Sequence, residues 1–202
     1  MKRSEKLALF LGMLSGDGCM PIQHNGEGYR DYAVRFCNTN KKLVDLFDNL
    51  FFDLFGINGR IAYEDRENKK RLWSFCKYSK KIFLDLRKLG FPEGVKRDIL
   101  RITDSIWKGN INEKAAFIKG VLITDGCLRK QGSILFHSGS KLFLNDLADL
   151  MKEVIGVRKP VKEYIQREKY YSYQLNLNKK ETAILLSQVP PWDNGTPHAL
   201  SP

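Results

Sequence analysis

Residues 10–18 of the chain read FLGMLSGDG, and residues 118–126 read IKGVLITDG. In both stretches apolar residues recur at helical spacing ahead of an Asp-Gly pair, which begins at Asp17 and at Asp125. Each stretch therefore predicts a helix that ends at its Asp-Gly pair with glycine as the C-cap. Ser4 is expected to cap the first of these helices.

The similarity between the two parts of the chain extends beyond these helices. Two further pairs of blocks match in the same order, residues 36–57 with 136–157 and residues 79–81 with 178–180. Three ordered matches indicate an internal duplication. We expect two domains, residues 1–106 and residues 107–202.

Hydrophobic patterns predict the same elements in each half, and the first helix is followed by strand, strand, helix, strand, strand and helix. A strand is expected directly after each Asp-Gly pair, and a helical part of the connecting segment around Lys96–Ile102. The other predicted elements are a strand over residues 31–36, a helix over Lys41–Phe55, strands near Arg60–Asp65 and Leu72–Tyr78, a helix over Ser79–Leu89, and their counterparts Ile134–His137, Ser140–Ile155, Val161–Arg167, Tyr171–Leu177 and Lys179–Gln188. The predicted fold class is α+β, a tandem pseudo-two-fold repeat of αββαββα with antiparallel sheets.

Small residues occupy matching places on the two repeated helices: Gly12 and Gly16 on the first, Gly120 and Thr124 on the second. A glycine inside a helix costs about 1 kcal/mol relative to alanine, so a pair of them calls for a packing reason. Small residues four apart lie on one face and let a second helix approach closely. We expect the two helices to pack on each other and to bring the two Asp-Gly pairs together.

Asp17 and Asp125 would then be two carboxylates at adjacent helix C-termini, where negative charge is disfavoured. Either one alone fits an ordinary Asp-Gly turn. As a pair in matching context they favour a divalent cation, and Mg²⁺ suits one or two carboxylates completed by water and phosphate oxygens. This combination is typical of metal-assisted phosphodiester cleavage.

The composition points to an anionic partner. The chain has 34 Lys and Arg against 23 Asp and Glu, a formal net charge of +11, and an apolar content of 43% that excludes a disordered chain. The excess is shared between the halves, +6 in residues 1–106 and +5 in residues 107–202. No apolar run is long enough to span a membrane, and the four cysteines are too scattered to predict a zinc site. We expect an intracellular protein, in the cytoplasm of a prokaryote or in an organelle of a eukaryote.

The two motifs resemble those of the LAGLIDADG homing endonucleases, and the order of elements resembles the compact, single-chain, two-motif, intron-encoded members, notably archaeal ones. The resemblance implies a monomer whose motif helices form the interdomain interface and whose sheets form a saddle on double-stranded DNA. It implies Mg²⁺, or another divalent cation such as Mn²⁺ or Ca²⁺, bound by Asp17 and Asp125 with help from the carbonyls of Gly16 and Thr124. The implied activity is site-specific cleavage at a long pseudo-palindromic site, leaving 3′ overhangs.

The resemblance also suggests further catalytic residues. A Gln or Asn near the attacking water would be Asn38, with the shorter Ser138 at the matching place in the second half. The basic residue usual in such sites would be Lys96, for which a solvated surface lysine is the alternative, and the second half offers no equivalent.

Alternate strand positions are expected to face DNA. Arginine, glutamine and asparagine there suit base edges, whereas turn lysines suit phosphates. The residues expected at the DNA surface are Arg35, Arg60, Arg66, Lys69, Lys70, Ser74, Lys130, His137, Lys162, Tyr164, Gln166, Ser172, Gln174 and Asn176. Two alternatives to a nuclease remain open: a maturase that binds its intron RNA, and a DNA-binding relative that does not cleave.

Overall fold

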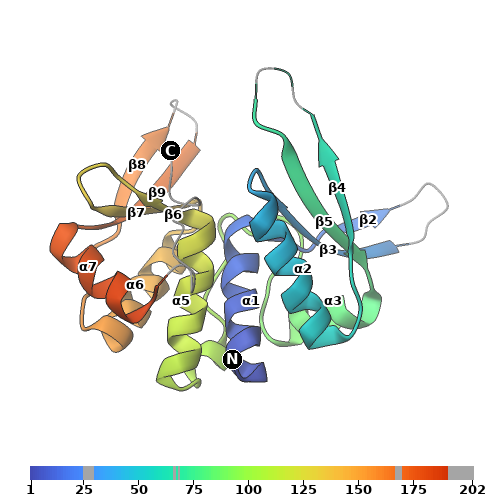
Figure 1. Cartoon of the computed structure of the whole chain (residues 1–202), viewed down its shortest axis with the longest axis horizontal. Helices are drawn as coiled ribbons and strands as arrows, with labels where there is room; N and C mark the ends of the chain where they lie inside the picture. Colours follow the sequence, from blue (N-terminus) through green and yellow to red (C-terminus); the bar gives the residue numbers. More distant parts are fainter. Residues whose placement is uncertain (25–29, 66, 68, 167–169, 191–202) are drawn as a thin grey trace.

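Two parallel helices form the centre of the molecule in the computed structural model, which describes residues 1–24, 30–65, 67, 69–166 and 170–190. Helices α1 (Arg3–Asp17) and α5 (Ile111–Asp125) lie side by side and run in the same direction (Figure 1). Their C-terminal ends reach the level of the two sheets, one on either side. The duplication therefore places the two Asp-Gly pairs at one end of a shared interface.

Glycine makes the close approach of these two helices possible. A Cβ atom on Gly120 would lie 2.8 Å from the Cα of Gly12 and 2.7 Å from the backbone nitrogen of Met13. Real Cβ atoms do not come so close to backbone, so both glycines are required by packing. The prediction that the two motif helices pack through their small residues is confirmed.

Each half of the chain contributes one antiparallel sheet, and the predicted α+β class is confirmed. The first sheet contains β1 (Gly18–Cys19), β3 (Arg30–Asn38), β5 (Leu72–Tyr78) and β4 (Arg60–Glu64) in that order, with β2 (Ile22–His24) paired to β3. The second contains β6 (Gly126–Leu128), β7 (Ile134–Ser138), β9 (Tyr170–Leu177) and β8 (Lys162–Gln166) in the matching order. As predicted, a short strand follows each Asp-Gly pair directly.

Amphipathic helices cover one face of each sheet: α2 (Lys41–Phe55) and α3 (Lys80–Lys88) on the first, α6 (Lys141–Ile155) and α7 (Lys179–Gln188) on the second. The row Phe36, Phe75 and Ile61 faces inward on the first sheet, where the Phe36 ring stacks on Phe47 of α2 at 4.4 Å between centroids. Side chains alternate along a strand, so neighbouring positions face away from the helices.

Matching residues also begin and end α2 and α6. Asn40 accepts from the backbone of Lys42 and Ser140 from that of Phe143, whereas Gly56 and Gly156 end the helices in the left-handed region at φ 73° and 69°. These caps explain why the predicted bounds of α2 hold and why those of α6 differ by one residue, since Ser140 is the N-cap and not the first helical residue. The division at residues 106 and 107 stays a prediction.

Two local predictions are wrong. Helix α1 begins at Arg3 with Lys2 as N-cap, and the Lys2 amide donates to the Glu5 carboxylate, so Ser4 lies inside the helix. Residues 96–102 are not a helix; the connecting segment forms α4 (Asp104–Trp107) instead.

The reason for the second error is tertiary. The backbone nitrogen of Ile102 donates to Asp146, and the carbonyl of Leu100 accepts from Ser140. These backbone groups bind α6 and its cap, so they are not available to a helix of their own. No helix in the described part of the chain has both the length and the apolar character needed to cross a membrane.

Candidate metal and nucleic-acid site

The two motif aspartates converge where α1 and α5 end. A Cβ atom on Gly16 would lie 2.6 Å from the Cβ of Thr124 and 3.3 Å from the carboxyl carbon of Asp125. The carboxyl group of the second half therefore lies against the last turn of the first helix, one residue from Asp17. The small residues predicted for helix packing also bring the carboxylates together.

Asp17 is oriented by a neighbouring strand. Asn38, the last residue of β3, donates from Nδ2 to the Asp17 Oδ2 at 2.6 Å and accepts from the backbone of Asn40. Burial raises the pKa of Asp17 to about 6, although the Asn38 hydrogen bond and the charge of Lys96 both lower it. Removal from water is thus only partly compensated at this carboxyl group.

The removal of Asp125 from water is compensated less than that of Asp17. Burial and, to a lesser extent, the negative charge of Asp17 together raise its pKa to about 7, against the lowering effect of the Lys96 charge. Ser138 occupies the position that matches Asn38, but its Oγ accepts from the backbone of Ser140 at 3.1 Å. A serine side chain is shorter than an asparagine side chain and carries one polar atom, whereas Asn38 binds the Asn40 backbone through its oxygen and Asp17 through its nitrogen.

Lys96 lies across the C-terminal end of α1 and is half-buried, unlike a solvated surface lysine. Its ammonium donates to the carbonyl oxygens of Leu14, at 3.0 Å, and of Ser15 and Gly16. The Leu14 carbonyl also accepts from the backbone of the C-cap Gly18. The carbonyls of the last turn carry the negative end of the helix dipole, so a positive charge is favourable there. Burial lowers the pKa of Lys96 to about 8, against the raising effect of the Asp125 and Asp17 charges.

The donor set fits a hard divalent cation. Two half-buried carboxyl groups with raised pKa values have an excess of unfavourable negative charge that a cation would offset. Among the described residues no group of three or more His, Cys, Asp and Glu side chains could hold a metal. Further ligands would be carbonyl oxygens, water or phosphate, as Mg²⁺ prefers. The Gly16 carbonyl, one of the two predicted carbonyl ligands, already accepts from Lys96.

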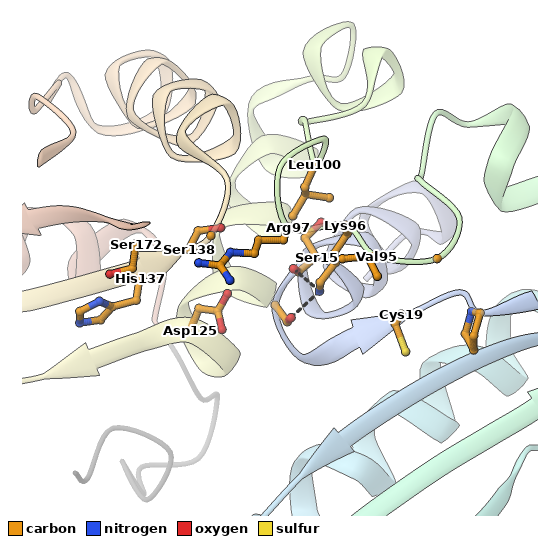
Figure 2. A pocket seen from close by; sticks show the side chains of 14 residues that line it. Ser15, Cys19, Val95, Lys96, Arg97, Leu100, Asp125, His137, Ser138 and Ser172 are labelled. Carbon is orange, nitrogen blue, oxygen red and sulfur yellow. Dashed lines mark hydrogen bonds between the residues drawn. The ribbon is translucent and has the colours of Figure 1, made fainter. Parts of the chain in front are cut away.

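A cavity of about 1130 Å³ opens in front of Asp125, between the linker and both sheets. Its lining includes Ser15, Cys19 and Lys96 from the first half and linker, and His137 and Ser172 from the second sheet. Figure 2 shows Asp125 pointing into this space and Lys96 turned toward the end of α1. Of the predicted catalytic residues, Lys96, Asp125 and Ser138 line this cavity, whereas Asn38 lines a second cavity together with Thr124.

The predicted DNA-facing residues form polar rows on the face of each sheet opposite the helices. On the first sheet, Arg35 pairs with Cys76, which pairs with Arg60, and Ser74 lies two positions along β5 from Cys76. The guanidinium of Arg35 donates to Gln23 at 2.8 Å. These rows present hydrogen-bonding groups at the spacing of neighbouring strands.

The second sheet has an equivalent row, in which Gln174 pairs with both His137 and Lys162. Along β9, Ser172 pairs with Tyr164, and Asn176 continues the same face. Lys69 and Lys70 of the β4–β5 turn are exposed, as is Lys130 of the β6–β7 turn. Arg66 lies outside the described residues, and Gln166 is described only by its place at the end of β8.

Sequence reasoning did not identify Arg97, which lines the cavity beside Asp125, Ser138 and Gly139. The available sequence signal was a second basic residue, Arg97, directly after Lys96 in the connecting segment. The contribution of Gln23 and Tyr78, which both lie within hydrogen-bond distance of Arg35, was also not predicted. The Gln23 contact depends on the pairing of β2 with β3, and the Tyr78 contact on the pairing of β3 with β5.

Residues 112–190 match a family model described as a LAGLIDADG-like domain. The match covers most of the second half of the chain. The resemblance seen in the two motifs is thereby confirmed for the half that the model matches. No curated protein matches the sequence.

Solved structures extend the likeness to the whole chain. Homing endonuclease I-DmoI in complex with DNA and Ca has a TM-score of 0.72 at 18% identity, over 100% of this chain and 94% of that one. Its complex with DNA and Mn gives 0.71 at 19% identity, over 93% and 97%. The full-length DUF199/WhiA protein from Thermatoga maritima gives 0.62 at 12% identity, over 95% of this chain and 57% of that one. At these identities the likeness establishes the fold.

Proposed function

We propose that this protein is a site-specific endonuclease that cleaves double-stranded DNA with a divalent cation. One observation carries the proposal: Asp17 and Asp125 converge at adjacent helix ends, in the gap between two polar sheet faces. A protein that only binds DNA has no need of two carboxylates whose pKa values are raised by burial.

The surface on either side of the carboxylates supports DNA as the substrate. Both sheets present rows of Arg, Gln, His and Ser side chains, which suit base edges in a major groove. The net charge of +11 favours a polyanion. The structures of similar fold include homing endonuclease I-DmoI bound to DNA with Ca and with Mn, which agrees with this assignment.

A divalent cation held by Asp17 and Asp125 would activate water and stabilise the charge that develops on the phosphate. The protein's own residues prepare the place. Asn38 fixes the orientation of Asp17, and Lys96 brings a positive charge next to both carboxylates. The closely packed α1 and α5 hold the two carboxylates at a fixed separation, so little reorganisation is required when DNA arrives.

Several finer properties belong to this proposal. We infer a monomer, because the two halves of one chain supply both sheets and both aspartates. A pseudo-palindromic site, 3′ overhangs, a preference for Mg²⁺, an intron-encoded origin and an intracellular location follow from the resemblance to the single-chain homing endonucleases.

The test first selects DNA duplexes that the protein binds and only then asks whether the protein cleaves them. Random-sequence duplexes are selected for binding in Ca²⁺, and the recovered sequence is then incubated with the protein in Mg²⁺, Mn²⁺ or EDTA. The proposal predicts double-strand cleavage at one position with Mg²⁺ or Mn²⁺ and none with EDTA. Binding without cleavage under every cation would instead support a DNA-binding protein that does not cut, and preferential selection of intron RNA would support a maturase.

A further inference from the structure

We propose that two adjacent linker residues, Lys96 and Arg97, serve opposite DNA strands. Lys96 binds and stabilises the scissile phosphate nearest Asp17, and Arg97 does the same for the scissile phosphate nearest Asp125 and Ser138. This assignment rests on the proposed endonuclease function. It supplies the second half with a cation that its own sequence does not provide.

The linker is held on both sides of this pair, so the two side chains have defined positions. Before the pair, the amide of Gly94 donates to the carbonyl of Met20 in the first half at 2.8 Å. After the pair, Arg101 binds Asp146 of α6 through Nε at 2.6 Å and Nη2 at 2.8 Å, and Ile102 donates to the same carboxylate. The chain therefore crosses from the first half to the second at residues 96 and 97.

Lys96 belongs to the first half by its contacts. Its ammonium donates to three carbonyls of the last turn of α1. Its ammonium is therefore fixed at the end of α1, although its charge acts on both Asp125 and Asp17.

Arg97 belongs to the second half by its contacts. Its side chain passes over Gly139, in the turn between β7 and α6, where a Cβ would lie 3.1 Å from the Arg97 Nε and 3.2 Å from its Cδ. Arg97 also lines the cavity with Asp125, His137 and Ser138. In Figure 2 the arginine side chain extends from the linker toward Ser138 and Asp125, whereas Lys96 turns the other way.

The chemistry of the two cations agrees with this division. A guanidinium offers a fixed fork of donors that matches phosphate oxygens, and an ammonium is a compact charge. Asp17 accepts from the Asn38 amide, whereas the Oγ of Ser138, at the matching position, accepts from the Ser140 backbone. An additional hydrogen-bond donor would therefore contribute more beside Asp125 than beside Asp17. Lys96 supplies charge at the first helix end, and Arg97 supplies charge and geometry at the second.

The test measures cleavage of each strand separately. The duplex selected for binding in Ca²⁺ carries a different label on each strand, and single-turnover nicking rates are measured in Mg²⁺ for the wild type, Lys96→Met and Arg97→Met. Arg97→Met should slow one strand roughly tenfold or more and leave the other within about twofold, by the usual scale for loss of one transition-state donor. Lys96→Met should slow the opposite strand.

Two further variants separate a direct role from damage to the linker. Arg97→Lys keeps the charge and should recover part of the lost rate on the same strand. Gly139→Ala fills the space of the Arg97 side chain and should reproduce the strand bias with the linker sequence intact. Arg87→Met, at an exposed arginine of α3 that pairs with Glu93 at 3.3 Å, is the matched control and should leave both rates unchanged.

The outcomes separate this assignment from the proposed function. If the wild type cuts both strands and Arg97→Met slows them equally, or slows neither, the assignment is wrong and the endonuclease stands. Slowing of the same strand by both single variants would also overturn it. A wild type that binds the duplex and nicks neither strand would overturn the endonuclease, and this assignment with it.

Discussion

The two ends of the central helix pair have the same backbone plan and different side-chain environments. At the end of α1, Asp17 accepts from Asn38 at 2.6 Å. The Lys96 ammonium donates to the carbonyl of the neighbouring residue, Gly16. At the end of α5, Ser138 takes the position of Asn38, and its Oγ accepts from the Ser140 backbone at 3.1 Å. Burial accordingly raises the pKa of Asp17 to about 6 and that of Asp125 to about 7.

This difference shows what a duplication preserves. Helix packing, sheet order and capping positions repeat because each half must bury its own core and fit its partner at Gly12 and Gly120. The polar residues around each carboxylate are not fixed by packing, so they have diverged. The linker then adds Lys96 and Arg97 once, and the site is symmetric in backbone but not in charge.

The largest effect on cleavage is expected from the aspartates that both halves share, Asp17 and Asp125. Asp17→Asn and Asp125→Asn should each lower double-strand cleavage by about a thousandfold or more, since each removes a charged ligand of the proposed cation. DNA binding should persist in both. Single-turnover cleavage and a binding titration in Ca²⁺ check this, and a variant that loses cleavage only because it loses binding would argue against the assigned role.

Substitution of a glycine between α1 and α5 should have the next largest effect, on the free energy of unfolding. Gly120→Val places a branched side chain against the Gly12 backbone, so we expect a loss of about 3 kcal/mol in the free energy of unfolding. Ala183→Val, on an exposed position of α7, is the control and should cost well under 1 kcal/mol. Denaturant melts of both variants measure the difference, and equal losses would contradict the close helix approach.

A smaller effect should follow from exchanging the residues that distinguish the ends. Ser138→Asn introduces the amide that orients Asp17 and should lower the pKa of Asp125, moving the acidic limb of the pH–rate profile to lower pH. Asn38→Ser removes that amide, should raise the pKa of Asp17 and should slow the reaction about tenfold. If the pH–rate profile does not move in either variant, the two ends do not differ in the way their contacts indicate.

The smallest expected effect is on the pH dependence of stability in the absence of metal. The carboxyl pKa values lie above the ordinary 3.8 in the folded state, so the folded protein binds more protons than the unfolded chain between about pH 4 and pH 7. Stability without metal should therefore fall as the pH rises through this range. Asp125→Asn should remove more of that slope in thermal melts than Asp17→Asn, and an equal slope in all three proteins would count against the raised pKa values.

The repeat, the elements and the carboxylate pair could be predicted from the sequence because each depends on local pattern and symmetry. Spacing alone placed Gly12, Gly120, Asp17 and Asp125 on equivalent helices, and alternation placed Arg35 and its neighbours on the outer face of a sheet. These features repeat within the chain, which gives each prediction a second copy as support.

The unpredicted features are those that occur once and depend on tertiary contact. Residues 96–102 look helical by pattern, but Asp146 and Ser140 take up their backbone groups. The start of α1 at Arg3 is the exception, because it depends on a local contact between the Lys2 amide and the Glu5 carboxylate. The passage of Arg97 over Gly139 joins residues that are far apart in the chain, so neither residue marks it in sequence.

The central claim is that Asp17 and Asp125 together bind a divalent cation at the DNA, and Mn²⁺ binding tests it most directly. Electron paramagnetic resonance would follow free Mn²⁺ during titration of the complex with its selected duplex, for the wild type and for the Asp17→Asn, Asp125→Asn double variant. The account predicts saturable Mn²⁺ binding by the wild-type complex and its loss in the double variant, with DNA binding retained. Identical Mn²⁺ titrations of the two complexes would contradict it.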